Sequence, residues 1–520
     1  MSIYKRRFIL PTVLATIFML SGCGGSSASS HDTTTQLKAN IDTIVVIYAE
    51  NRAFDTLYGK FPGADGIDNA LANPELYIQL DRDGSVLPSL PKVWNTTDTQ
   101  WAWIEGLPNK PFEITGDKVG NVDPLSIAGP DLVHRFYNNQ MQINGGKNNK
   151  FAAYSDAGGL SMGYYDGSSM KMWKLAQQYT LADKFFQGTF GGSFQNHQYL
   201  VCLCTPRWNA DIAPVPQKRI SILDAIITAV TGIPSLALAN ADSALVSAPR
   251  YISDRNLSPE INGRYYAINT TQPAFQPSFT PPPTEDQSSP DWLIANPAPA
   301  NEGAIPLPPS TEATIGDRLT EKGISWKWYS GGWNLALSDY STIYSDPLAF
   351  QPHHQPFNYY NRFTPKTEQG KKQRAEHLKD YEDLVADIAA GKLPQVVFFK
   401  PAGVDTQHAG YATIRQGDDH IADLIQKLQA SPQWGKMAII VTYDENGGFY
   451  DHAKPPKVDY WGPGTRIPAI IISPYAKRGF VDHTEYDIGS IHQFISRRFG
   501  LEILSGARKG FGDLTNAFNF

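Results

Sequence analysis

The fold of this 520-residue chain is decided by residues 44–51, which read IVVIYAEN: an apolar run that ends directly in Glu50-Asn51. Residues 438–445, AIIVTYDE, repeat the pattern and end in Asp444-Glu445. Short continuous apolar runs are typical of strands that are buried on both faces of a parallel sheet. Ligands of open α/β sheets bind outside the carboxyl ends of the strands, so the two doublets could share one cation. We expect the strand before Glu50 to be the first of the sheet.

Two further apolar runs, Val396–Phe399 and Ile467–Ile472, are bounded by turn or charged residues. Helical patterns occupy Arg374–Ala390 and Asp418–Gln429, before and after the first of these runs. Strands that alternate with helices indicate parallel pairing through crossover connections. The sequence therefore predicts an α/β fold with a doubly wound, mainly parallel sheet.

The N-terminus has the sequence pattern of an export signal. Lys5-Arg6-Arg7 precede an apolar segment, Phe8–Leu20, that is too short to span a membrane. Residues 20–23, LSGC, resemble the lipobox of bacterial lipoproteins, in which the cysteine is lipidated. We expect a lipoprotein signal peptide over residues 1–22, with an ordinary secretory signal as the alternative, and a flexible tether over residues 23–40.

The lipid at Cys23 is the only membrane attachment that we expect, and Gly24 after it resembles lipoproteins sorted to an outer membrane. The predicted location is the bacterial cell envelope, with the protein on the outer membrane and facing the periplasm or the surface. A net charge of -6 and the lack of a basic patch argue against a nucleic-acid partner.

Residues 41–520 are expected to form a single catalytic domain with a Pro-rich insertion around residues 273–309, because such a segment is excluded from sheet interiors. The apolar segment Ile220–Pro249 is interrupted by Asp224, Gly232 and Pro234, which favours a buried or capping helix over a membrane span.

Cys202 and Cys204 are the only cysteines besides Cys23. Residues i and i+2 of a strand have Cα atoms about 6.5–7 Å apart and parallel side chains, which suits a disulfide poorly. We therefore predict two packed thiols. A metal site built on this pair lacks further cysteines to complete it.

The acidic doublets are candidate metal ligands, since Glu, Asp and Asn offer the hard oxygen donors that Ca²⁺, Mg²⁺ or Mn²⁺ prefer. Buried carboxylates at one sheet edge would repel each other without a cation. Gly447-Gly448, after the second doublet, permit close backbone approach. The alternatives are a strand-closing turn in which Arg52 pairs with Asp55, or doublets with one member in solvent.

Residues 190–197, FGGSFQNH, contain a candidate nucleophile, Ser193. Two glycines before a serine allow a sharp turn that exposes the hydroxyl. A neighbouring cation would lower the pKa of that hydroxyl, so that no histidine base is needed there. The alternative is a glycine-rich turn in which Ser193 caps a helix.

Four of the eleven histidines lie in loop-like settings, where they could bind phosphate oxygens or protonate a leaving alkoxide: His134, His353, His354 and His408. His377 and His420 fall on helical patterns and are expected to face solvent. His197 and His452 lie inside motifs and are interpreted as supporting groups.

Three motifs, residues 50–55 (ENRAFD), 191–197 (GGSFQNH) and 444–452 (DENGGFYDH), together resemble the bacterial phosphoesterase family of acid phosphatases and phospholipases C, and most closely its AcpA-type acid phosphatases. The resemblance extends from about residue 41 to residue 500. It implies an alkaline-phosphatase-like α/β core with loop and helical insertions. It also implies one divalent metal ion (Ca²⁺, Mg²⁺, Mn²⁺ or Zn²⁺) and phosphate-ester substrates.

The resemblance also assigns roles. Ser193 matches the nucleophile that forms a phosphoserine and touches the metal, and the loop histidines match the phosphate-binding and acid-donating groups: His134, His353, His354 and His408. The remaining metal ligands would be Glu50, Asn51, Asp444 and Glu445. One departure is Ala53, where many members carry a small hydroxyl residue.

The expected activity is that of an acid phosphatase with an acidic optimum, because cationic histidines attract a dianionic phosphate. The alternative is a phospholipase C acting on phosphatidylcholine-like lipids. That branch shares the first and last motifs but tends to present threonine at the nucleophile position. A third reading is a surface lipoprotein with a structural cation.

Overall fold

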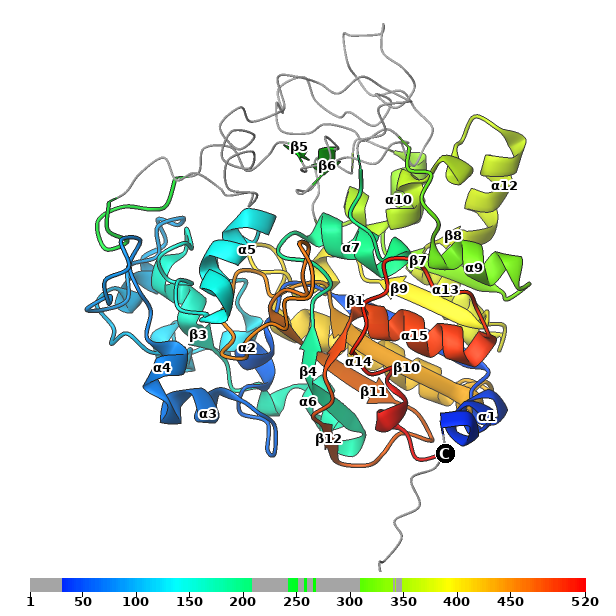
Figure 1. The fold of residues 1–520 in the computed structure, drawn as a ribbon, viewed down its shortest axis with the longest axis horizontal. Helices are drawn as coiled ribbons and strands as arrows, with labels where there is room; N and C mark the ends of the chain where they lie inside the picture. The colour runs from blue at the N-terminus through cyan, green and yellow to red at the C-terminus, as the bar shows by residue number, and fades with distance from the viewer. Residues whose placement is uncertain are drawn as a thin grey trace, which may run out of the picture.

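The computed structural model describes residues 30–207, 242–250, 257–259, 265–267, 309–339, 342 and 348–520. Within these residues the core is a nine-stranded sheet of order β12-β4-β11-β10-β1-β9-β7-β8, with β13 paired to β4 (Figure 1). Its strands are β1 (Thr43–Ala49), β4 (Thr180–Phe186), β7 (Trp326–Ser330), β8 (Leu378–Lys379), β9 (Val396–Lys400), β10 (Met437–Tyr443), β11 (Arg466–Ile472), β12 (Phe480–Asp482) and β13 (Tyr486–Asp487). Two-stranded pairs form from β2 (Phe112–Glu113) with β3 (Gly163–Tyr164) and from β5 (Leu257–Pro259) with β6 (Tyr265–Ala267).

The centre of the sheet is the pair β1 and β10, the two runs that end in acidic doublets. They are parallel and in register from Thr43 opposite Met437 to Ala49 opposite Tyr443. Every residue of both strands is buried. Because the strands end side by side, Glu50 and Asp444 leave the sheet at the same edge, as predicted.

The predicted doubly wound, mainly parallel α/β sheet is confirmed. Only β11 is antiparallel to its neighbours β10 and β4. A parallel return after β10 would need a crossover, usually through a helix. Residues 444–465 form no helix, so the chain turns straight back into β11. The strands β4 and β7 were not predicted.

The helices form two groups that flank the sheet (Figure 1). One group joins α7, α9 and α15, and the other joins α6, α13 and α14. The helices are α1 (Ser30–Asn40), α2 (Phe54–Tyr58), α3 (Ile67–Ala72), α4 (Pro74–Tyr77), α5 (Phe136–Ile143), α6 (Lys171–Gln178), α7 (Ser193–Cys202), α9 (Ile315–Glu321), α10 (Trp333–Ser338), α12 (Glu368–His377), α13 (Tyr381–Ala389), α14 (Ile414–Ala430) and α15 (Ile488–Phe499).

The helix predicted over Asp418–Gln429 lies within α14 and buries its apolar face as expected. The single helix predicted over Arg374–Ala390 is wrong, because the chain divides into α12, β8 and α13. Asp380 caps the start of α13, and its side chain accepts a hydrogen bond from the backbone of Asn334. His377 is buried against the Trp326 ring rather than exposed, and its Nδ1 lies 2.9 Å from the Trp326 carbonyl oxygen.

The tether predicted over residues 23–40 differs from the structure in its second half, which forms α1. Leu37 is fully buried, and Nε of Arg497 on α15 donates to Oγ1 of Thr34 at 2.7 Å, so packing against α15 fixes this segment. The predicted signal peptide and Cys23 lie outside the described residues, as do the Pro-rich insertion up to residue 308 and most of Ile220–Pro249. None of the helices in the described ranges has the length and apolar character needed to cross a membrane.

Candidate active site

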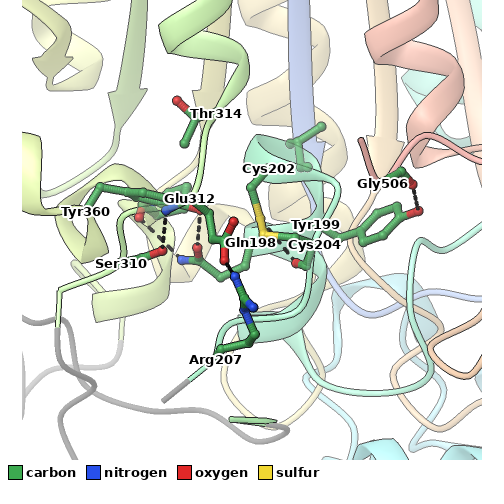
Figure 2. The surroundings of a disulfide bond; sticks show 12 residues. Gln198, Tyr199, Cys202, Cys204, Arg207, Ser310, Glu312, Thr314, Tyr360 and Gly506 are labelled. Carbon is green, nitrogen blue, oxygen red and sulfur yellow. Dashed lines mark hydrogen bonds and ion pairs between the residues drawn. A yellow bond between two sulfur atoms is a disulfide. The ribbon is translucent and has the colours of Figure 1, made fainter. Parts of the chain in front are cut away.

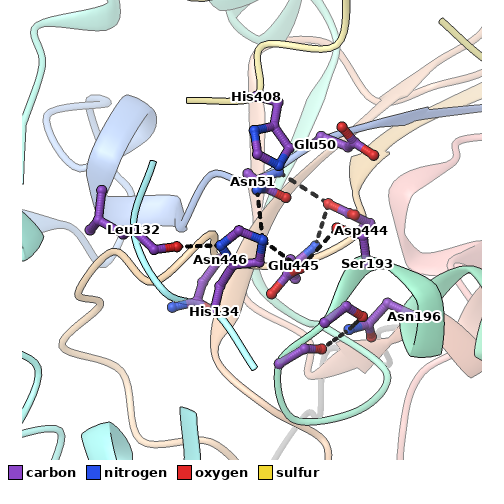
Figure 3. A network of polar contacts seen from close by, with 12 residues as sticks. Glu50, Asn51, Leu132, His134, Ser193, Asn196, His408, Asp444, Glu445 and Asn446 are labelled. Carbon is purple, nitrogen blue, oxygen red and sulfur yellow. Dashed lines mark hydrogen bonds and ion pairs between the residues drawn. The ribbon is translucent and has the colours of Figure 1, made fainter. Parts of the chain in front are cut away.

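The two doublets meet at the carboxyl edge of β1 and β10. The backbone N–H of Asn51 donates to Oδ1 of Asp444 at 3.0 Å (Figure 3). Glu50, Asn51, Asp444 and Glu445 have no exposed surface. Asn51 has φ of 59°, a left-handed conformation that asparagine tolerates better than most residues. The alternative in which one member of each doublet faces solvent is therefore wrong.

Ser193 joins this edge from the first position of α7. Its Oγ donates to Oε1 of Glu445 at 3.0 Å (Figure 3). Gly191 and Gly192 before it have φ of 57° and 40°, and a Cβ at Gly191 would overlap the backbone of Arg135. The two glycines are thus required for the turn that delivers the hydroxyl.

Three oxygen atoms at this edge are buried and have no hydrogen-bond partner among the described residues: Oδ1 of Asn51, Oδ2 of Asp444 and Oε2 of Glu445. Burial raises the pKa of Asp444, and burial together with Asp444 raises that of Glu445 well above its usual value. Leaving such groups unpaired is costly, and a cation removes the cost. The oxygens fit a hard divalent ion, so these residues would hold it.

Glu50 is surrounded by donors. On its Oε1 converge Nζ of Lys400 at 3.0 Å, Nε2 of His354 at 2.9 Å and Nε2 of His353 at 3.2 Å. Tyr411 donates its hydroxyl to Oε2 at 3.2 Å. Burial alone would raise the pKa of Glu50, but Lys400 and the histidines hold it well below its usual value. Glu50 is therefore ionised, with Oε1 held by Lys400 and the two histidines and Oε2 by the Tyr411 hydroxyl.

Lys400 and Tyr411 were missed by the sequence analysis. Lys400 is fully buried at the end of β9, the strand next to β1. A lysine after an apolar run usually marks the end of a strand, so the run Val396–Phe399 gave no sign of its role. Tyr411 belongs to the same segment as His408, and their rings stack with centroids 4.4 Å apart.

The four predicted histidines all border the site, in two pairs. His353 and His354 contact Glu50, and burial lowers the pKa of His354 to about 3, which leaves it neutral. Nε2 of His134 lies 3.3 Å from Nδ2 of Asn51 and 3.8 Å from Oε1 of Glu445. The His408 ring lies 5.5 Å from that of His134, centroid to centroid.

The pair His134 and His408 differs in charge. Burial lowers the pKa of His134. The carboxylates of Glu445 and Asp131 have a larger opposite effect and raise the pKa to about 9. Burial lowers the pKa of His408. At neutral pH the site thus offers one imidazolium and one neutral imidazole.

His197 lies within the site, whereas His452 lies outside it. Nδ1 of His197 is 2.7 Å from the carbonyl oxygen of Ser193 and 4.0 Å from Oδ2 of Asp444, which fits a supporting role. His452 binds Asp55 at 2.7 Å through Nδ1. Arg466 pairs with the same Asp55 at 3.0 Å, so the predicted alternative of an Arg52–Asp55 pair is wrong.

The far end of α7 carries a disulfide between Cys202 and Cys204, so the prediction of two free thiols is wrong (Figure 2). The prediction assumed a strand. Cys202 instead ends a helix, and Leu203 takes a left-handed conformation with φ of 49°. This brings the two Cα atoms to 5.1 Å, within the range that a disulfide spans.

The chain is similar in sequence to known proteins over most of its length. The model of the Phosphoesterase family matches residues 41–502. The "Non-hemolytic phospholipase C" of Pseudomonas aeruginosa is 23% identical over 518 residues, which cover 92% of this chain and 57% of that protein. "Phospholipase C A" of Mycobacterium tuberculosis is 28% identical over 267 residues, which cover 44% of this chain and 49% of that protein.

The "Non-hemolytic phospholipase C" of Burkholderia pseudomallei is 27% identical over 256 residues, which cover 40% of this chain and 36% of that protein. The matches thus span between 36% and 57% of these relatives. Among solved structures, an alkaline phosphatase superfamily protein from Vibrio parahaemolyticus is similar with a TM-score of 0.32 and 9% identity, covering 76% of this chain and 72% of that one.

Proposed function

This chain belongs to the phosphoesterase family, and from that premise we propose that it is a metal-dependent acid phosphatase that hydrolyses phosphomonoesters through a phosphoserine at Ser193. The observation that carries the proposal is the hydrogen bond from Ser193 to Glu445 at the edge where three buried oxygens lack partners. A nucleophile and a set of hard oxygen donors are thereby brought to one point.

The proposed ligands of the divalent ion are Asn51, Asp444 and Glu445, with Oε2 of Glu50 and Oγ of Ser193 completing the set. When bound, the ion supplies positive charge that lowers the pKa of the Ser193 hydroxyl. Mg²⁺, Ca²⁺ and Mn²⁺ suit these oxygen donors, and Zn²⁺ is the further candidate.

In the proposed reaction, cationic His134 binds the phosphate oxygens. The Ser193 hydroxyl loses its proton to solvent, Oγ attacks phosphorus in line, the bond from phosphorus to the leaving oxygen breaks, and a phosphoserine forms. His408, or one of the pair His353 and His354, donates a proton to the leaving alkoxide. Water then attacks the phosphoserine and releases inorganic phosphate. The lowered pKa values of His354 and His408 support an acidic optimum, because these groups carry a proton only in acid.

Phospholipase C is the second candidate, because the similar proteins from Pseudomonas, Burkholderia and Mycobacterium carry that name. Serine at position 193, where that branch tends to have threonine, supports the monoesterase instead.

The deciding experiment compares initial rates on three substrates with metal-loaded protein: an aryl phosphate monoester, the matching aryl phosphodiester, and phosphatidylcholine vesicles. We expect the monoester to be hydrolysed at least about tenfold faster than either diester, with the higher rate at acidic pH. Faster release of phosphocholine from the vesicles would contradict the acid phosphatase and support the phospholipase C.

The proposed location is the cell envelope, through a lipid at Cys23. Expression of the full chain in a bacterium with lipoprotein processing, followed by fractionation, tests this. The unchanged chain should sediment with outer membranes, and Cys23→Ala should not. Equal sedimentation of both chains would contradict a lipid anchor.

A further inference from the structure

The turn that carries Ser193 is held by buried amide side chains to which the proposed reaction gives no part. Asn196 lies one helical turn after Ser193 and is fully buried. Its Oδ1 accepts from the backbone N–H of Thr189 at 2.9 Å. Its Nδ2 donates to the carbonyl oxygens of Gly191 at 2.6 Å and Gly192 at 3.3 Å. One side chain thus satisfies backbone groups along the whole turn.

Asn139, on α5, ties the same turn to the loop after β10. Its Oδ1 accepts from the backbone N–H of Gly191 at 3.3 Å and from Nε2 of Gln187 at 3.4 Å. Its Nδ2 donates to Oγ1 of Thr465 at 3.1 Å and to Oδ1 of Asn446 at 3.4 Å. Asn446 directly follows Glu445, so Asn139 connects the turn of the nucleophile with the segment of the proposed metal ligands.

A second set of contacts fixes the turn against the segment of His134. The backbone N–H of Gly192 donates to the carbonyl oxygen of His134 at 2.8 Å. The absence of a side chain at Gly191 lets the turn touch the backbone of Arg135. Since α5 begins at Phe136, the helix that carries Asn139 starts beside this contact.

We propose that Asn139 and Asn196 are positioning residues that hold Oγ of Ser193 at hydrogen-bonding distance from Glu445. The catalytic part of this inference rests on the proposed function. Removal of either amide leaves backbone N–H or C=O groups of the turn unpaired in the interior, and the turn must move or admit water to satisfy them. A displacement of about 1 Å at a reacting group costs about 100-fold in rate.

The kinetic test uses Asn139→Ala, Asn196→Ala and a matched control, Asn138→Ala. Asn138 is the neighbouring buried residue of α5, and its Nδ2 donates to the carbonyl oxygen of Tyr154 at 2.6 Å rather than to the turn. We expect kcat on an aryl phosphate to fall about 100-fold in the two test variants, with KM and metal content within about threefold. The control should keep kcat within about twofold. Equal losses in all three variants, or unchanged kcat in the test variants, would overturn the proposal.

Hydrogen–deuterium exchange provides a readout that is independent of hydrolysis. Peptides that cover residues 187–196 should exchange faster in Asn196→Ala and Asn139→Ala than in the unchanged protein, and Asn138→Ala should leave their exchange unchanged. Unaltered exchange in the test variants would refute the positioning role even in an active enzyme. If Ser193 proves dispensable for hydrolysis, the proposed function fails while the exchange result still decides whether the amides hold the turn.

A second variant covers the case in which Asn196→Ala does not fold. Asn196→Asp has nearly the same size and keeps the acceptor for Thr189, but it replaces the amide donor to the carbonyl oxygens of Gly191 and Gly192 with a carboxyl oxygen. It should show the same selective loss of kcat and faster exchange. A folded Asn196→Asp protein with normal values of both would contradict the proposal.

Discussion

Oγ of Ser193 donates a hydrogen bond of 3.0 Å to Oε1 of Glu445, a residue 252 positions further along the chain. Ser193 begins α7, whereas Glu445 follows the central strand β10. The geometry of this contact therefore depends on how the turn before α7 packs at the edge of the sheet.

Ser193→Ala is expected to lower kcat/KM at least about 1000-fold, because the attacking oxygen is removed. The matched control is Ser161→Ala, since Ser161 is also buried and donates to the carbonyl oxygen of Gly158 at 2.8 Å, away from the doublets. Steady-state kinetics and circular dichroism check both variants. Retained activity in a folded Ser193→Ala protein would favour the reading of a structural cation.

Asp444→Asn should weaken divalent-ion binding by at least about 100-fold, because it removes the charge but keeps the shape of a proposed ligand. Metal titration of the chelator-treated protein measures the change. Asp418→Asn is the control: Asp418 is equally buried but accepts from the backbone of Lys171 at 2.7 Å and of Met172 at 2.8 Å. Equal affinity in the unchanged protein and the Asp444 variant would remove Asp444 from the ligand set.

Lys400→Met is expected to destabilise the protein by roughly 3–5 kcal/mol, because it leaves the ionised Glu50 without its buried counter-charge. The double variant Lys400→Met/Glu50→Gln should recover part of this loss. Urea denaturation of the single and double variants measures it. Lys327→Met is the control on the neighbouring strand β7, where Lys327 pairs with Asp387 in a half-buried position.

His452 should make the free energy of unfolding depend on pH. Burial and Arg466 lower the pKa of His452. Asp55 and Asp65 have a larger opposite effect and raise the pKa to about 10. A raised folded-state pKa contributes stability that is complete below the unfolded value of about 6.5 and is lost as pH rises to about 10. Asp55 and Asp65 have lowered pKa values, so they stay ionised across this window.

The measurement is urea denaturation of the unchanged protein and of His452→Gln between pH 6 and 10. The difference in unfolding free energy should shrink by about 1.4 kcal/mol per pH unit above pH 6.5. His483→Gln, which removes a half-exposed contact with Asp183, should shift stability by less than about 1 kcal/mol. A difference that is constant with pH would contradict the assignment.

The disulfide closes a very short loop, so its contribution to stability should be small. Cys202→Ser/Cys204→Ser is expected to lower the free energy of unfolding by about 1.5 kcal/mol, the chain-entropy value for three residues. Thermal unfolding of the unchanged protein with and without reductant gives the comparison. A loss several times larger would show that the bond also constrains α7.

The sequence singled out the main groups of the candidate site because local patterns mark them. The apolar runs before Glu50 and Asp444 indicate buried strands. Ligands of open α/β sheets bind outside the carboxyl ends of such strands. The glycines before Ser193 indicate a sharp turn. Loop-like settings singled out four histidines out of eleven, to which the resemblance then assigned roles, and the structure places all four around the candidate site.

Other features had no local signal. Lys400 looks like a strand boundary until β9 is placed next to β1. Asn139 and Asn196 are ordinary polar residues of helices until the turn of Ser193 packs against them. The disulfide depends on a single left-handed residue, Leu203, and the reversal of β11 depends on a connection without a helix.

The sequence by itself therefore determined the α/β class, the strands that end in acidic doublets and the glycine turn before Ser193, because each follows from residue type and short-range spacing. Tertiary structure alone decided which buried charges face each other. It also decided that Oγ of Ser193 lies within hydrogen-bonding distance of Glu445. Those contacts join residues hundreds of positions apart, and their geometry is set by strand register and helix packing, which no local pattern encodes.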